Sequence, residues 1–201
     1  YKMNATLIRT FDCGSKPNAE FPRQTKLVTY KPLLTEVIDA VEAEVVRNNL
    51  KAIFYNIEIR TSVDTDDLFH PKPAEYAQLL YNVISTKKIT RKVFIQSFDI
   101  RALKAMRQID SSIPSSLLVD ASTTDYKKAI DSLGFKPAYY SPEMSLVTDE
   151  MINYMKQNNI QVIPWVVNSA NDIKAMKTIG ANGIITDNVD LAMQLHNSGI
   201  V

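Results

Sequence analysis

The chain contains few of the residues that usually build disulfide, nucleophilic or metal sites. Among 201 residues it has one cysteine, Cys13, two histidines, His70 and His196, and one tryptophan, Trp165. A single cysteine excludes an internal disulfide framework. Because no histidine is near Cys13 in the sequence, we do not expect it to act as a nucleophile. No apolar run approaches the ~20 residues that a membrane-spanning helix needs.

The chain also lacks an excess of charge of either sign. It has 23 basic and 22 acidic residues, a formal net charge of +1, and the charges are interspersed along the sequence. This balance gives no reason to expect a nucleic acid or an anionic membrane as a partner. The hydrophobic content of 45% allows one sizeable core, so we expect residues 1–201 to form a single domain.

The N-terminus, Tyr1-Lys2-Met3-Asn4, has no charged start followed by an apolar run, so we expect no signal peptide. It also has no initiator methionine, which is consistent with a processed or truncated product. The sequence therefore leaves the compartment unknown. The protein is cytoplasmic, or it is periplasmic or secreted if a leader has been removed.

From residue 51 onward, short β-rich runs alternate with amphipathic helical stretches. The predicted strands are Ala52–Ile59, Lys92–Ser97, Ser116–Val119, Ala138–Tyr140, Gln161–Val167 and Gly183–Thr186. The predicted helices are Lys72–Thr86, Ile100–Ile109, Thr123–Leu133, Thr148–Asn158, Ala170–Ile179 and Val189–Asn197. Such alternation predicts a parallel sheet with right-handed crossovers. About six βα units are present, whereas a closed barrel needs eight and typically ~250 residues. The chain is therefore either an open doubly wound sheet or a barrel without its first two strands.

The first 50 residues have a different character. Residues 1–30 are polar and irregular, and we expect a long loop excursion there. Pro32 then stands at the first turn of a predicted helix, Leu33–Asn48. The apolar stripe of this helix consists of Leu34, Val37, Ile38, Val41 and Val45.

Several residues mark the ends of the predicted helices. Thr148 and Ser169 stand at helix starts, where a side-chain oxygen can cap the first turn. Gly134, Gly180 and Gly199 stand where helices should end.

The first predicted strand carries the most informative pattern, because its two faces differ. Alternate residues of a strand point to opposite sides. Three apolar residues, Tyr55, Ile57 and Ile59, therefore share one face, and three polar residues, Asn56, Glu58 and Arg60, share the other. The apolar face would pack under helices. The polar face suits the mouth of a barrel lumen, where (β/α)-barrel enzymes present a metal ligand and a phosphate-binding cation.

Five short motifs, in order and with matching spacing, give this sequence a resemblance to a known family. They are Asn56-Ile57-Glu58-Ile59-Arg60, Gln96-Ser97-Phe98-Asp99 followed by Ala102-Leu103, Ser141-Pro142, Pro164-Trp165-Val166-Val167-Asn168, and Gly183-Ile184-Ile185-Thr186-Asp187. On these motifs the chain resembles the glycerophosphodiester phosphodiesterase family from about residue 11 to its end. Each motif is weak alone, and the five in order make the match strong.

The resemblance implies a TIM (β/α)8-type barrel, here incomplete, that cleaves glycerophosphodiesters to glycerol 3-phosphate and an alcohol in lipid metabolism. It implies a divalent cation, Mg²⁺ or Ca²⁺, with Glu58 as a ligand. Arg60 stands where the family usually has a phosphate-contacting lysine and would be catalytic by stabilising charge on the phosphate. Trp165 would line the pocket mouth and pack against the glycerol moiety.

The sequence also departs from the family pattern. The family has His-Arg-Gly in its first strand, a Glu-x-Asp pair in its second and another histidine soon after, and none of these occurs here. The resemblance therefore covers the C-terminal three-quarters of the barrel, without the histidine pair and the carboxylate pair. The alternative to a metal-dependent hydrolase is a non-catalytic module, derived from that barrel, that binds phosphate head groups or serves assembly.

The residues themselves leave alternatives open. Glu58 and Arg60 could form a structural ion pair, and Trp165 could belong to the core. Gln96 is either a substrate contact or a hydrogen-bond partner inside the lumen. Asp99 and Asp187 lie near strand ends but are more typical of helix N-caps.

Three further polar residues are weaker candidates for the site. His70 follows the Glu58 strand and is either a surface-loop histidine or a substrate contact. Lys16 would approach the phosphate if the N-terminal loop folds over the barrel mouth. His196 lies near the end of the last helix and is expected to be structural, because it suits the negative end of the helix dipole.

The absence of two strands would leave an unpaired edge on Ala52–Ile59 and another on Gly183–Thr186. We expect these edges to be covered by a partner chain through self-association or by residues 1–30, unless the chain is truncated.

Overall fold

A computed structural model describes residues 2–200 of the protein. Five parallel strands form one sheet in the order β1-β2-β3-β4-β5. The strands are β1 (Tyr55–Glu58), β2 (Val93–Ser97), β3 (Ser115–Val119), β4 (Tyr139–Pro142) and β5 (Gln161–Val162). The helices are α1 (Ala5–Ile8), α2 (Leu34–Arg47), α3 (Pro73–Thr86), α4 (Ile100–Ile109), α5 (Tyr126–Leu133), α6 (Asp149–Gln157), α7 (Ala170–Ile179) and α8 (Val189–Asn197). Three short 3-10 turns are η1 (Val63–Thr65), η2 (Thr90–Lys92) and η3 (Met144–Leu146).

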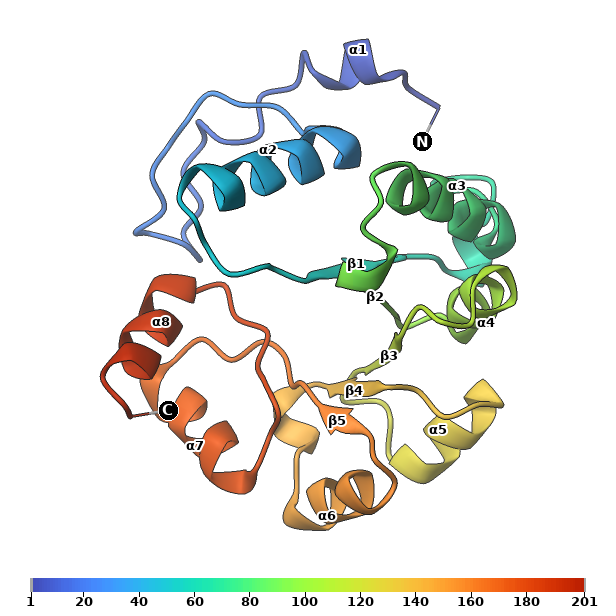
Figure 1. The fold of residues 1–201 in the computed structure, drawn as a ribbon, viewed down its shortest axis with the longest axis vertical. Coiled ribbons are helices and arrows are strands. Elements are labelled where there is room, and N and C mark those ends of the chain that lie inside the picture. The colour runs from blue at the N-terminus through green and yellow to red at the C-terminus, as the bar shows by residue number, and fades with distance from the viewer. Residues whose placement is uncertain (1, 201) are drawn as a thin grey trace.

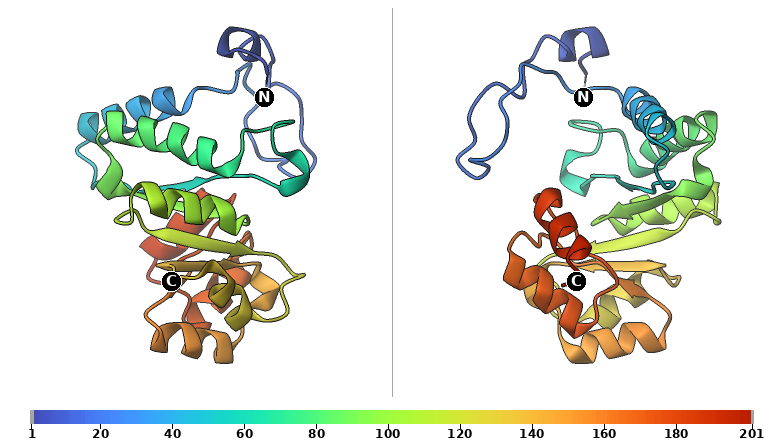
Figure 2. Two further views of the ribbon diagram at one scale, coloured as in Figure 1. Left: turned by 90° about the vertical axis from the view of Figure 1, so that its right-hand side faces the viewer. Right: turned by 60° about the vertical axis from the view of Figure 1, so that its left-hand side comes forward.

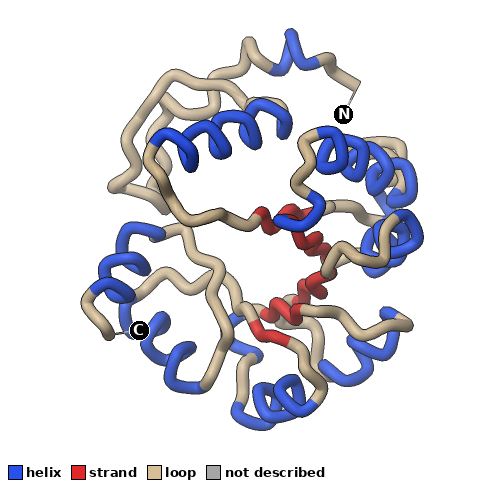
Figure 3. Tube along the Cα trace, viewed as in Figure 1, coloured by secondary structure: helices blue, strands red, loops and turns tan. Residues whose placement is uncertain are grey.

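The helices α2 to α8 surround an arc of strands, which is the arrangement of a (β/α) barrel (Figure 1). Figure 3 shows the strands along one side of the ring only, with loop segments opposite them. The prediction of an incomplete barrel is therefore confirmed, with five regular strands. No helix within residues 2–200 is long and apolar enough to cross a membrane.

The main core lies between the strands and the helices that cover them. Its most buried members include Ile59 of the β1 end, Ile95 of β2, Leu103 of α4 and Leu117 of β3. A second, smaller apolar cluster holds α7 and α8 together and contains Val167, Ile173, Met176 and Leu195. The apolar face predicted for the first strand thus packs against the core between strands and helices, and Ile59 has no exposed surface.

The predicted helices agree closely with the structure. Thr148 and Ser169 accept hydrogen bonds from the first turns of α6 and α7, as their positions indicated. Gly134 and Gly180 end α5 and α7 in the left-handed region, where a residue without a Cβ is favoured. The start of α5 was predicted too early. The helix begins at Tyr126, because Asp125 accepts hydrogen bonds from the amides of its first turn.

Three strands, β1, β2 and β5, are shorter than predicted, whereas β3 and β4 are each one residue longer than predicted. The expected Ala52–Ile59 strand is regular only over Tyr55–Glu58, because Tyr55 already faces the first residue of β2 and earlier residues have no strand beside them. The expected Gln161–Val167 strand is regular only over Gln161–Val162. Hydrogen bonds to β4 continue as far as the Trp165 amide, but Pro164 has no N–H to donate on the other side, toward Ile185.

The prediction of a regular strand at Gly183–Thr186 is wrong. The segment runs beside β5 and keeps parts of a ladder: the amide of Ile185 donates to the Pro164 carbonyl (2.8 Å), and its carbonyl accepts from the Val167 amide (2.8 Å). At the start of the ladder, however, the side chain of Asn182 accepts the hydrogen bond from the Val162 amide (2.8 Å). A side chain therefore replaces a backbone partner, and no regular strand forms.

The helix α2 packs less tightly than its apolar stripe predicted. Of the stripe only Ile38 is fully buried, whereas Val37 is 37% exposed. Beyond the stripe, Val46 is 80% exposed. Glu42 ties the helix to β1 and to the turn η2 before β2, because it accepts hydrogen bonds from the Tyr55 hydroxyl (2.9 Å) and from Lys92 (2.7 Å).

Residues 2–30 form an excursion that stands off the barrel (Figure 2). It contains the one-turn helix α1 and a closed loop. In the loop the Asp12 carboxylate accepts hydrogen bonds from the amides of Gly14, Ser15 and Thr29. Arg23 links the excursion to the far side of the ring through hydrogen bonds to Asn188 (3.3 Å) and Asp190 (3.5 Å). No backbone hydrogen bond within residues 2–200 joins the excursion to β1, so the expected covering of that edge by residues 1–30 is not seen.

Ser97 connects the carboxyl ends of β1 and β2, and its removal should measurably destabilise the fold. Its buried hydroxyl donates to the Ile59 carbonyl (2.6 Å) and accepts from the Asp99 amide (3.0 Å). We expect Ser97→Ala to lower the free energy of unfolding by about 1–3 kcal/mol, because both backbone groups lose their partner. Urea unfolding measures the effect. Ser132→Ala, which removes an exposed hydroxyl on α5, is the control and should change little. Equal effects of the two substitutions would contradict this role of Ser97.

Candidate functional site

A cavity of about 720 Å³ lies where the carboxyl ends of the strands meet. Its walls come from segments that follow four different strands, which is the usual location of a site in a (β/α) barrel. The lining residues are Ile59, Arg60, Thr61, Ser62, Thr65, Phe69, His70, Tyr76, Phe98, Asp120 and Trp165. The structure thus brings together three predicted site residues, Arg60, His70 and Trp165.

Arg60 is the exposed cation of this cavity. It directly follows the buried Ile59 at the end of β1, so its side chain leaves the polar face of that strand. Within residues 2–200 it forms no ion pair, and the alternative of a structural ion pair with Glu58 is therefore not realised. Its donors remain available to an anion.

Glu58 has a carboxylate oxygen with an unusual environment. Its Oε1 atom is buried and has no hydrogen-bond partner. A buried acceptor without a partner is unfavourable, and a bound cation would remove this penalty. Within residues 2–200, however, no group of three or more histidine, cysteine or acidic side chains is placed to hold a metal ion. The residues described therefore supply one plausible ligand and not a complete metal site.

Gln96 lies beside Glu58 on the neighbouring strand. The two residues are in register between β1 and β2, and Gln96 Oε1 accepts a hydrogen bond from the Asn56 side chain (2.7 Å). The hydrogen bond that was one of the two alternatives for Gln96 is thus present. Gln96 does not line the cavity that contains Arg60.

Trp165 is held at the rim of the cavity by two contacts. Its indole Nε1 donates to the Ser141 carbonyl (2.9 Å), and its ring meets Phe98 edge to face with the ring centroids 5.5 Å apart. It is only partly buried, so it lines the cavity rather than filling the core. Phe98 was not singled out from the sequence, although it directly follows β2, where side chains reach the same edge as Arg60.

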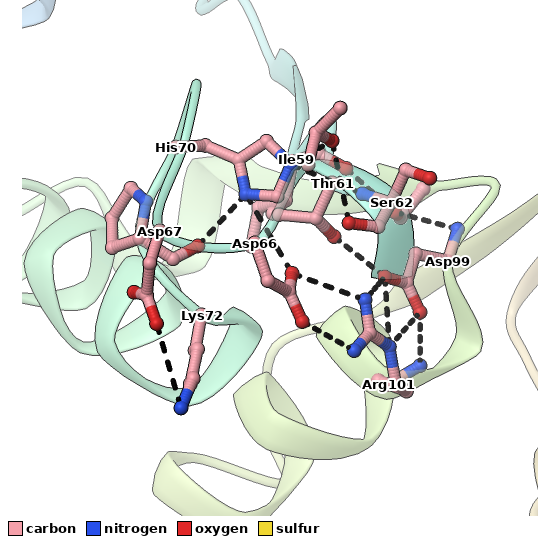
Figure 4. A network of polar contacts seen from close by, with 12 residues as sticks. Ile59, Thr61, Ser62, Asp66, Asp67, His70, Lys72, Asp99 and Arg101 are labelled. Carbon is pink, nitrogen blue, oxygen red and sulfur yellow. Dashed lines mark hydrogen bonds and ion pairs between the residues drawn. The ribbon is translucent and has the colours of Figure 1, made fainter.

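His70 is not the surface-loop histidine that was expected as the alternative, since it is only 9% exposed. Its Nε2 accepts from the Ser62 amide (3.1 Å) and lies 2.7 Å from the Thr65 hydroxyl. The ring proton therefore belongs on Nδ1, which donates to the Pro71 carbonyl (2.9 Å). Both ring nitrogens hold the loop between β1 and α3, as Figure 4 shows around His70.

The other predicted site residues lie elsewhere. Lys16 is exposed and lines a separate hollow formed within the N-terminal excursion, away from the cavity of Arg60. Asp187 is not a helix N-cap: it accepts a hydrogen bond from Asn168, and Asn188 occupies the N-cap position of α8. His196 lies in the last turn of α8, as expected.

Asp99 is an N-cap, as predicted, because it accepts from the Arg101 amide at the start of α4 (2.9 Å). It also takes part in a cluster that the sequence did not reveal. Its carboxylate accepts from the Thr61 hydroxyl (2.8 Å) and from the Arg101 guanidinium, which also pairs with Asp66 (2.7 Å). Asp66 and Arg101 are 35 residues apart, so no local pattern could indicate this contact. Burial acts to raise the pKa of Asp99, but the hydrogen bonds from Arg101 and Thr61 outweigh it and lower the pKa below its usual value.

The lowered pKa of Asp99 predicts a loss of stability in acid. The stabilisation is fully present above about pH 4, the pKa of an unfolded aspartate, and disappears as the pH falls through the lower pKa of the folded state. We therefore expect the free energy of unfolding to fall more steeply below about pH 4 in the wild type than in Asp99→Asn. Urea unfolding at a series of pH values tests this. Asp64→Asn, the same change at an exposed residue of η1, should keep the wild-type slope. An Asp99→Asn variant with that slope would contradict the ion pair.

Comparisons with known proteins agree with this geometry. The model of the glycerophosphoryl diester phosphodiesterase family matches residues 2–191. A curated relative from Caldanaerobacter subterraneus subsp. tengcongensis, named glycerophosphodiester phosphodiesterase, is 22% identical over 195 residues, which are 96% of this chain and 70% of that protein.

Two solved structures show the same fold. One, of a putative glycerophosphoryl diester phosphodiesterase from Silicibacter pomeroyi, has a TM-score of 0.83 at 23% identity and covers 98% of this chain and 69% of its own. The other is an Oleispira antarctica phosphodiesterase in complex with the product sn-glycerol-3-phosphate. It has a TM-score of 0.71 at 15% identity, and the match covers 93% of this chain and 68% of that one. Thus the chain spans about seven tenths of each of these proteins. The family match over most of its length shows that the chain belongs to the glycerophosphoryl diester phosphodiesterase family.

Proposed function

We propose that this chain supplies the phosphate- and glycerol-binding part of a site that hydrolyses glycerophosphodiesters to glycerol 3-phosphate and an alcohol. The observation that carries the proposal is that Arg60 and Trp165, which are 105 positions apart, line one cavity of about 720 Å³ at the strand ends. The family supports this reaction class. The product bound in the Oleispira antarctica structure supports a three-carbon phosphate as the ligand class.

In this proposal Arg60 binds the phosphate. A guanidinium donates two parallel hydrogen bonds to two phosphate oxygens, which fixes the anion and offsets the charge that develops on it during displacement. Arg60 has no competing carboxylate partner within residues 2–200, so its positive charge is not neutralised before substrate binds. It is the one catalytic residue that we assign.

Trp165 and Phe98 would contact the glycerol carbons. Their edge-to-face arrangement gives a rigid apolar wall, and the hydrogen bond from the indole to Ser141 fixes its orientation. An aromatic face suits the C–H groups of a small alcohol, while the hydroxyl groups remain in the open part of the cavity.

Glu58 would be the contribution of this chain to a divalent-cation site, for Mg²⁺ or Ca²⁺. Its partnerless, buried Oε1 fits a ligand for a hard cation, which prefers oxygen. Because the described residues offer no complete donor set, substrate oxygens, water or further groups would have to fill the remaining positions. When bound, the cation would supply charge stabilisation at the phosphate.

A second candidate function, binding without turnover, is favoured by one observation. Both ring nitrogens of His70, the only histidine that lines the cavity, are used to hold the loop. In its observed position this histidine therefore has no nitrogen available to transfer a proton to or from a substrate. The chain would then bind phosphorylated glycerol without cleaving the diester.

The first experiment measures release of glycerol 3-phosphate from glycerophosphocholine with Mg²⁺ or Ca²⁺ and with EDTA. We expect cation-dependent release that Glu58→Gln abolishes. Arg60→Ala should lower kcat/KM about 10- to 100-fold, because a charge-assisted contact to phosphate is lost. Arg60→Lys should recover part of this loss, since lysine keeps the charge but not the paired donors. Glu75→Gln, a change of an exposed carboxylate on α3, is the matched control and should retain activity.

Each outcome distinguishes the candidates. Release that is unaffected by EDTA and by Glu58→Gln would refute the cation role of Glu58. Saturable binding of glycerol 3-phosphate that Arg60→Ala weakens, without turnover, would favour the binding module. Neither turnover nor binding would refute both functions.

A further inference from the structure

Arg101 joins two acidic residues from different parts of the chain. Its guanidinium contacts Asp99 at the start of α4 (2.6 Å) and Asp66 in the loop between β1 and α3 (2.7 Å). Further hydrogen bonds to the two carboxylates run from its Nε (3.0 Å) and its second terminal nitrogen (3.3 Å). Figure 4 shows the guanidinium between the two acids. Most donors of Arg101 are thus occupied, so it cannot itself bind an anion in the cavity.

The same cluster holds the backbone on both sides of Arg60. Before it, the Ile59 carbonyl accepts from the buried Ser97 hydroxyl (2.6 Å). After it, the Thr61 hydroxyl donates to Asp99 (2.8 Å), and the next amide, that of Ser62, donates to His70 (3.1 Å). Arg60 is therefore exposed and unpaired while its neighbours in the chain are fixed.

Charge explains why Arg101 is needed in this cluster. The side chains of Asp66 and Asp99 are only 16% and 10% exposed, so two like charges lie close together in a partly buried place. Without the cation between them they would repel, and the loop would move away from α4. Thr61 donates to the same Asp99 carboxylate, so a displacement of that carboxylate would also disturb the anchor of Thr61.

We infer that Arg101 is the positioning residue of the site: through Asp66 and Asp99 it fixes the loop and holds Arg60 where the phosphate binds. This inference rests on the proposed function and names a residue that acts on the ligand only through Arg60. A displacement of about 1 Å at a binding group can change a rate or affinity by up to two orders of magnitude. Arg101 thus determines the affinity of the cavity without touching its ligand.

The test is a double-mutant cycle read by the single tryptophan. Trp165 lines the cavity and is the only indole of the chain, so its emission or its indole NMR signal reports binding at this place alone. Glycerol 3-phosphate is the titrated probe. We expect Arg60→Ala to raise Kd about 10- to 100-fold and Arg101→Gln to raise it about 10-fold. The double variant should have the Kd of Arg60→Ala.

A matched control and a second variant separate positioning from general damage. Lys72→Gln removes an ion pair of the same loop, Lys72 with Asp67 (3.4 Å), in which both side chains are well exposed. It should leave Kd unchanged. Asp66→Asn removes the ion pair between the loop and Arg101 but keeps the pair of Arg101 with Asp99. If Arg101→Gln does not fold, Asp66→Asn replaces it in the cycle. If the losses of binding free energy caused by Arg101→Gln and Arg60→Ala simply add in the double variant, the inference is overturned, because a merely structural arginine acts independently of Arg60. An increase in Kd for Lys72→Gln as large as that for Arg101→Gln would also overturn it.

Hydrogen exchange of the Ser62 amide distinguishes failure of this inference from failure of the proposed function. This amide is bound to His70 and follows Thr61, so its exchange reports the anchored segment itself. We expect exchange about tenfold faster in Arg101→Gln and Asp66→Asn and unchanged in Lys72→Gln. If the wild type binds no glycerol 3-phosphate, the proposed function fails, and faster exchange in the two variants still supports the anchoring by Arg101. If exchange of the Ser62 amide is unchanged in Arg101→Gln and Asp66→Asn, the anchoring by Arg101 is refuted, whether or not the protein binds glycerol 3-phosphate.

Discussion

The parallel pairing of β1 with β2 is the constraint on which the site depends. It places Glu58 opposite Gln96 and brings the two strand ends to one edge. There Ser97 and Asp99 from the β2 side reach Ile59 and Thr61 from the β1 side. A slip of one residue in this register would turn Glu58 toward the helices and Ile59 into the lumen, since alternate residues face opposite sides. The register with β2 thus keeps the polar residues of β1 on the face away from the helices.

Much of the fold was predictable because the helices are locally encoded. The bounds of α4, α7 and α8 follow from periodic apolar residues, from capping by Asp99 and Ser169, and from a glycine just after α7 and α8. The strands were harder, because a strand ends where its neighbour ends. Gly183–Thr186 has the composition of a strand, but the Asn182 side chain takes one of its ladder positions. No local pattern contains that information.

The site was predictable only in part. The place of Arg60 followed from strand alternation, and that of Trp165 followed from a family resemblance. Their common cavity depends on the barrel that brings together segments 105 positions apart. The cluster around Arg101 was missed for the same reason, since Asp66 is 35 residues away. For His70 the surface-loop alternative is wrong, because both ring nitrogens have partners within the loop, and no local pattern indicates those partners.

The loose packing of α2 has a consequence for how the molecule fluctuates. Only Ile38 of this helix is fully buried, so few apolar contacts oppose its detachment. The segments with α4, β2 and β3, by contrast, contain many fully buried side chains. Regions with few buried contacts open at a lower free energy than the whole domain unfolds. The molecule therefore consists of a stable body, which carries the loop of Arg60, and a less stable cooperative unit formed by α2, which can open while the strand ends next to Arg60 remain folded.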